Sequence, residues 1–164
     1  MKTTILILTI LTSILFSNII MAGDKNELKL SYGYSGAEYF IRDFNLSNCP
    51  SDITFGTIGL SYGRKINEKM SIGAGLNYIP VRSPKCGDRG SKNEHFVIPY
   101  VEFDYRHIVN PNFELYSAAS IAVPAWFFSH LTIIGFRKGN KHAFFGEIGI
   151  GGGQVVAAGY SFEF

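Results

Sequence analysis

Apolar and polar residues alternate with a period of two along most of this chain. In the clearest segment, 70–78, one face carries Met70, Ile72, Ala74, Leu76 and Tyr78. The other face carries only small or polar residues. A period of two is that of a β-strand. The alternation recurs in eight segments, which are 27–34, 54–64, 70–78, 96–108, 113–123, 130–138, 143–151 and 155–164. The pattern therefore predicts an all-β protein.

The connections between these segments alternate in length. Those after the second, fourth and sixth segments (66–69, 110–112 and 139–141) are short and rich in turn residues. Two of the others, 35–53 and 82–95, are long, although those near 124–125 and 151–154 are short. Each strand is close to the roughly 9 to 11 residues that a tilted strand needs to cross a bilayer. Short turns at one end and longer loops at the other are typical of a transmembrane barrel with both termini on the turn side.

The chemistry of the two faces adds a second argument. The apolar face carries aromatic residues near the strand ends, as at a membrane interface: Tyr62, Tyr78, Tyr105, Tyr160 and Phe164. The opposite face is rich in glycine and serine, which suits the narrow interior of eight strands. We therefore expect a closed, eight-stranded, antiparallel, up-and-down transmembrane β-barrel. Two features fit this pattern poorly: Pro99 interrupts a strand, and segment 130–138 is partly apolar in both phases.

The N-terminus has the pattern of a secretory signal peptide. Lys2 precedes an apolar run over 5–16, and Met21-Ala22-Gly23 provides small residues for cleavage after Ala22. We expect residues 1–22 to be a cleaved signal peptide and 23–164 to be the barrel domain, located in the outer membrane of a Gram-negative cell. An uncleaved signal anchor is the alternative. The net charge of +2 in 164 residues gives no reason to expect a nucleic-acid partner.

The C-terminal segment 155–164 resembles the terminal recognition strand of outer-membrane barrels. Together with 130–137 and 144–151 it resembles the last hairpins of the small outer-membrane β-barrel family common in Bacteroidota. The resemblance covers about the last third of the chain. It implies insertion by the barrel-assembly machinery, with Tyr160, Phe162 and Phe164 as the assembly signal, and it implies no catalytic residues. We also expect no cofactor and no metal. We expect a monomer surrounded by outer-membrane lipid and lipopolysaccharide.

The strand phases direct a set of charged side chains into the interior: Glu102, Asp104, Arg106, Glu114, Arg137 and Glu147. Buried charges must pair. We expect Arg106 and Arg137 to pair with Glu102, Asp104 or Glu147 and to fill the lumen as a structural plug. The alternative is a narrow path for ions or protons.

An enzymatic alternative is a lipid-A-modifying hydrolase or acyltransferase, which needs a serine and a histidine on one face. Ser129 and His130 are adjacent and therefore point to opposite faces of a strand. His95 and His107 have no serine two residues away. A strand-borne triad is thus disfavoured, while a loop-built site using His95 or Asp88 stays open.

The loops supply the remaining candidates. Trp126, Phe127 and Phe128 form either an aromatic belt at the outer interface or a docking tip for a partner. Adhesion or protein contact through the long loops is a third class of function.

Cys49 and Cys86 lie in the connections after the first and third strands, so the strand count puts both on one side. Export supplies oxidising conditions, and we expect a disulfide between them, with two unpaired thiols as the alternative.

Overall fold

The computed structural model describes residues 26–35, 53–54, 56–83, 92–122 and 129–164. These residues form nine strands: β1 (Asn26–Ser35), β2 (Ile53–Thr54), β3 (Thr57–Lys65), β4 (Met70–Ser83), β5 (Lys92–Asn110), β6 (Phe113–Ala122), β7 (His130–Gly139), β8 (His142–Gly151) and β9 (Gln154–Glu163). Over the same ranges, no helix is long and apolar enough to cross a membrane.

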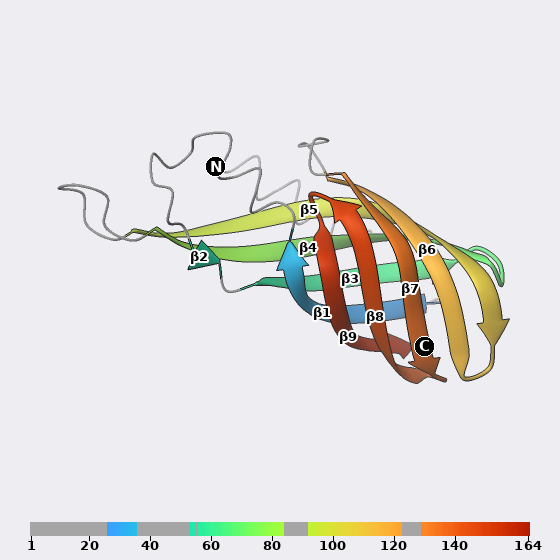
Figure 1. Ribbon diagram of the computed structural model, residues 1–164. Coiled ribbons are helices and arrows are strands. Elements are labelled where there is room, and N and C mark those ends of the chain that lie inside the picture. The colour runs from blue at the N-terminus through green and yellow to red at the C-terminus, as the bar shows by residue number, and fades with distance from the viewer. Residues whose placement is uncertain (1–25, 36–52, 55, 84–91, 123–128) are drawn as a thin grey trace.

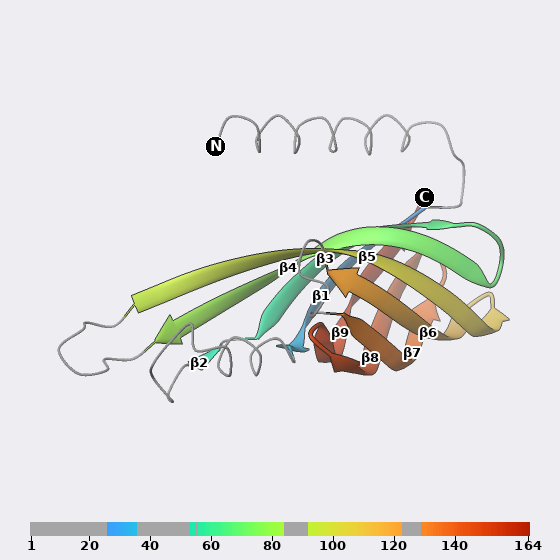
Figure 2. The ribbon, with the colours of Figure 1, turned by 90° about the horizontal axis from the view of Figure 1, so that it is seen from above.

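Eight of these strands close into one antiparallel barrel, which confirms the prediction of a closed, eight-stranded, up-and-down β-barrel. The hydrogen-bonded order is β4-β3-β1-β9-β8-β7-β6-β5, and β5 pairs with β4 to complete the ring. The first and last strands are neighbours, and backbone hydrogen bonds join Asn26 and Phe164 in both directions at 3.0 and 3.1 Å. Figures 1 and 2 show the strands curving around a common interior. β2 lies outside the ring and pairs with the far end of β4.

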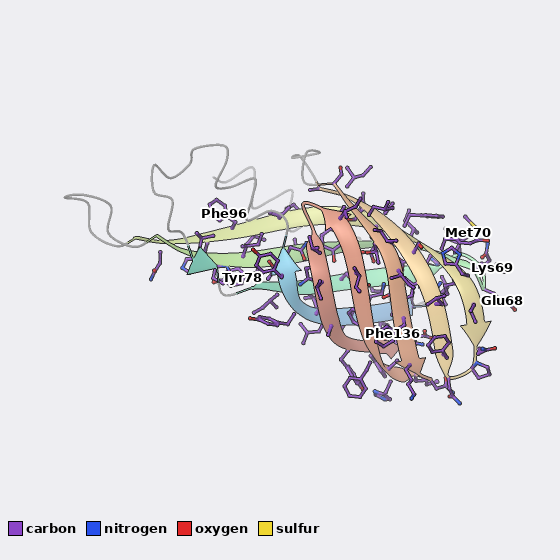
Figure 3. All side chains as sticks on the ribbon, in the orientation of Figure 1. Glu68, Lys69, Met70, Tyr78, Phe96 and Phe136 are labelled. Atoms are coloured by element: carbon purple, nitrogen blue, oxygen red, sulfur yellow. The ribbon has the colours of Figure 1, made fainter. Side chains whose placement is uncertain are left out.

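The barrel has two ends, which differ in their connections. At the turn end lie the short connections 66–69, 111–112 and 140–141, together with the start of β1 and the end of β9. At the other end, the loop end, lie the last residues of β1, β4, β6 and β8. Gly139 has a φ of 136°, and a Cβ there would overlap the carbonyl oxygen of His142, so this hairpin requires glycine. Figure 3 shows Glu68 and Lys69 at the turn end, opposite Phe96 on the β4–β5 hairpin.

The polarity of the barrel is the reverse of that in a water-soluble protein. Large apolar side chains cover the outer surface, with exposed fractions of 61% for Tyr32, 70% for Phe144 and 55% for Ile148. Ionisable side chains fill the interior, where Arg106 is only 2% exposed. Soluble proteins bury charged groups only rarely and rarely expose apolar patches this large.

A β-bulge explains why segment 130–138 was ambiguous. In β7 the register shifts at Ile133 against both neighbouring strands, so Ile133 and Ile134 both face outward. Thr132 lies inward before the bulge and Gly135 and Arg137 lie inward after it. The inserted residue changes the phase within one strand. Neither single phase read from the sequence could fit the whole segment.

The β4–β5 hairpin extends beyond the barrel at the loop end (Figures 1 and 2). β5 pairs with β6 only from Tyr100 onward, and Pro99 stands one residue earlier. Among the described residues, Pro99 therefore has a neighbouring strand on one side only, which reconciles it with the fold.

The inward face of this hairpin changes character along β4. It carries small and polar residues from Ser71 to Asn77 and then buried Ile79 and Val81, which pack with Phe96 and Ile98 of β5. The inward face is therefore polar in the barrel and apolar in the projection. The boundary is marked by Tyr78, whose hydroxyl lies 2.8 Å from Nδ1 of His95.

Candidate functional site: the charged interior

The first group of interior charges lies at the turn end. This turn-end cluster consists of three cations and three carboxylates, namely Lys65, Arg106, Arg137, Glu27, Glu114 and Glu163. Arg106 Nε donates to Glu114 Oε2 at 3.0 Å, and Arg137 Nη2 lies 2.9 Å from Glu163 Oε1. Lys65 Nζ donates to the same Glu163 oxygen at 2.7 Å. The cluster is electrically balanced when all six groups are ionised.

The second group lies midway along the lumen. This central cluster consists of Lys29, Glu102, Asp104, Tyr116 and Glu147. Lys29 Nζ donates to Asp104 at 3.0 Å and to Glu102 at 3.3 Å, and the ammonium lies 5.2 Å from the centre of the Tyr116 ring. The Tyr116 hydroxyl donates to Glu147 Oε1 at 2.5 Å. Glu147 thus has a phenol as its hydrogen-bond partner, and Lys29 is the one cation set against three carboxylates in this group.

All six predicted lumen residues lie in the interior, but their partners differ from those expected. Arg106 pairs with Glu27 and Glu114, and Arg137 pairs with Glu27, Glu114 and Glu163. The expectation that Arg106 and Arg137 pair with Glu102, Asp104 or Glu147 was wrong. The physical reason is position along the barrel axis, because the two arginines lie nearer the turn end than Glu102 and Glu147.

Four further charged members of these clusters were not predicted from the sequence: Glu27, Lys29, Lys65 and Glu163. The signal was present, since the alternation that turns Leu28 and Leu30 outward turns Glu27 and Lys29 inward. Lys65 and Glu163 follow in the same way from the inward phase of Ser61 and Ser161. These residues stand near strand ends, where a charge is easily mistaken for a solvent-exposed one.

A small polar cavity of about 30 Å³ lies above the central cluster toward the loop end. It is lined by Asn77, Tyr100, Glu102, Ser120, His130, Thr132, Glu147, Gly153 and Gln154. Gln154 is fixed there, because it accepts a hydrogen bond from Ser31 at 2.7 Å and donates one to the Thr57 carbonyl at 2.8 Å. A cavity of this size holds water molecules or one small ion and no larger solute.

The outer surface carries a serine–histidine pair that was not predicted from the sequence. His107 Nε2 lies 2.9 Å from Ser117 Oγ, and the Ser117 hydroxyl donates to the Ile133 carbonyl at 2.7 Å. The pair forms between strands, beside register shifts in β5 and β7, so spacing within one strand could not reveal it. Among the described residues no carboxylate contacts His107, and the serine hydrogen is directed to a carbonyl. The pair therefore lacks the orienting acid and the serine-to-histidine hydrogen bond of a hydrolytic triad.

The expected assembly residues Tyr160, Phe162 and Phe164 belong to an aromatic band at the turn end. Phe162 stacks on Phe164 with ring centroids 5.6 Å apart, and Tyr160 contacts the Phe144 ring edge-on at 5.5 Å. His142 Nδ1 lies 2.5 Å from the Tyr160 hydroxyl. These rings lie side by side on β8, on β9 and at the C-terminal Phe164.

Several predictions concern residues outside those that the structure describes. These are the signal peptide over 1–22, the Cys49–Cys86 disulfide, Asp88, and the aromatic run Trp126, Phe127 and Phe128. Within the described part of the chain, no group of three or more His, Cys, Asp or Glu side chains is placed to hold a metal ion.

Comparison with known proteins identifies no family for this chain: no family model, no curated protein and no solved structure matches it.

Proposed function

We propose that this protein is an integral outer-membrane β-barrel with a side-chain-filled lumen, and that it acts structurally or in surface binding through its loop end. The observation that carries the proposal is the reversed polarity of the barrel. The outer apolar surface spans the eight strands, while the buried groups include Lys29, Arg106, Glu114 and Arg137.

The energies favour a lipid environment over water. Burying one large apolar side chain is worth about 1.5–3 kcal/mol. If the whole outer apolar surface stayed in water, the hydrophobic stabilisation lost would be on the order of tens of kcal/mol. The net stability of a folded domain is only about 5–15 kcal/mol. Lipid removes that cost, and barrel closure satisfies the backbone hydrogen bonds that lipid cannot.

The interior argues against a general pore. Ion pairs cross the lumen between β1, β5, β6 and β7, and the two cavities that lie along it have volumes of about 30 and 10 Å³. Binding activity is therefore assigned to the loop end, where the β4–β5 hairpin projects with its own apolar packing of Ile79, Val81, Phe96 and Ile98.

Membrane residence is tested by fractionation and by gel electrophoresis with and without boiling. We expect the mature chain in the outer-membrane fraction, with a change in mobility on heating, because folded barrels resist detergent until heated. A chain that stays in the soluble periplasmic fraction would contradict the proposal.

The orientation is tested with two epitope insertions, one in the 84–91 connection and one at Asn67 in the β3–β4 turn. We expect antibody to label the first on intact cells and the second only after the outer membrane is permeabilised. Labelling of the Asn67 insertion on intact cells would reverse the assigned sides.

A further inference from the structure

A cavity of about 10 Å³ separates the central cluster from the turn-end cluster. Its lining includes Glu27, Asp104 and Arg106, which are 3%, 5% and 2% exposed. Each of them has one buried polar atom without a hydrogen-bond partner in the protein: Glu27 Oε1, Asp104 Oδ1 and Arg106 Nη1. Three buried, unsatisfied atoms on one cavity are unusual, since nearly all such groups are paired in folded proteins.

The rest of each side chain is held firmly. Asp104 Oδ2 accepts hydrogen bonds from Lys29 and Ser71, both at 3.0 Å, and Arg106 Nε donates to Glu114. Glu27 Oε1 lies 3.1 Å from Arg137 Nε, an ion-pair distance without the alignment of a hydrogen bond. These contacts fix the three unsatisfied atoms around the cavity.

The chemistry of the lining selects the ligand. One atom is a donor and two are acceptors, so the ligand must accept one hydrogen bond and donate two. Cations are disfavoured by Lys29, Arg106 and Arg137, and anions by Glu27, Asp104 and Glu114, all of which line the cavity. A cavity of this volume holds about one molecule of the size of water.

We propose that this cavity is a binding site for a single internal water molecule. The water accepts from Arg106 Nη1 and donates to Asp104 Oδ1 and Glu27 Oε1, which gives it the three hydrogen bonds typical of buried water. It joins the central and turn-end clusters into one hydrogen-bonded network running along the lumen. The site depends on the barrel interior alone and not on the proposed membrane location.

A crystal structure of the refolded barrel at a resolution that shows ordered water is the direct test. We expect one solvent peak within about 2.7–3.2 Å of Asp104 Oδ1 and Arg106 Nη1. An empty cavity would overturn the proposal, and so would a direct contact between those two atoms.

Magnetic relaxation dispersion of water in solution gives a second readout, because it counts long-lived internal waters. We expect Arg106→Lys to lose one such water, because lysine cannot place a donor at the Nη1 position while it holds Glu114. Glu163→Gln is the matched control, since Glu163 belongs to the turn-end cluster but does not line the cavity. Equal counts in both variants would refute the site, and if Arg106→Lys does not fold, the solvent peak in the unmodified protein decides.

Discussion

Replacing Glu114 by glutamine should destabilise the barrel far more than the same replacement of Glu147. Glutamine has nearly the shape of glutamate, so neither change opens a cavity. The two carboxylates differ in their partners. Glu114 lies 3.0 Å from Arg106 Nε, 3.5 Å from Lys65 Nζ and 3.9 Å from Arg137 Nη1. Glu147 accepts from the Tyr116 hydroxyl in a cluster where carboxylates outnumber cations.

The magnitudes follow from these partners. Removing the charge of Glu114 leaves three buried cations with two carboxylates, and breaking a buried ion pair in this way costs about 3–5 kcal/mol. Glutamine at position 147 can still accept from Tyr116 and removes one of three like charges. The expected cost is therefore at most about 1 kcal/mol, that of one perturbed hydrogen bond. A difference of about 3 kcal/mol corresponds to roughly a hundredfold in the unfolding equilibrium.

Urea unfolding and refolding in detergent, followed by circular dichroism and by gel mobility, measures both variants under the same conditions. The free energy of unfolding is extrapolated to zero urea. The unmodified protein and Tyr116→Phe serve as controls, because the phenylalanine variant removes only the hydrogen bond to Glu147. Equal losses of stability in Glu114→Gln and Glu147→Gln would show that the ion pairing at the turn end does not govern stability.

Three further predictions concern assembly, a disulfide and a turn. Phe164→Asp should reduce the amount of heat-modifiable barrel in the membrane fraction, and normal insertion would contradict a role of the last strand in assembly. Mass spectrometry without reductant should find Cys49 joined to Cys86. In the chain-entropy model this disulfide stabilises the folded protein by roughly 3 to 4 kcal/mol. Two alkylatable thiols would refute the bond. Gly139→Ala should lower the free energy of unfolding in urea by about 1–3 kcal/mol, because the φ of Gly139 is 136°. Gly63→Ala is the control and should cost less, since the atom nearest to its added Cβ is the Ile72 carbonyl oxygen at 3.8 Å. Equal losses in the two variants would contradict the strain at Gly139.

The alternation of the sequence was sufficient to predict the eight barrel strands but not where each of them ends. The segment 70–78 was extended by the structure to Ser83, and 96–108 became Lys92–Asn110. The apolar face changes sides beyond Tyr78, so the two-residue pattern appears broken there. At the same end of the barrel, Gly56, with a φ of 86°, separates β2 from β3 where the sequence predicted one strand.

The sequence by itself determined which side chains face inward, because successive residues of a strand point to opposite faces. It therefore placed Arg106, Glu114 and Arg137 in the lumen. Which of them meet was decided only by the tertiary structure. Glu27 reaches Arg106 and Arg137 from β1, and neither arginine lies on a strand adjacent to it. Such contacts cross the lumen, and they depend on the tilt and stagger of the closed barrel. The bulge at Ile133 and the pairing of His107 with Ser117 were decided in the same way, by the register between neighbouring strands, which no single strand encodes.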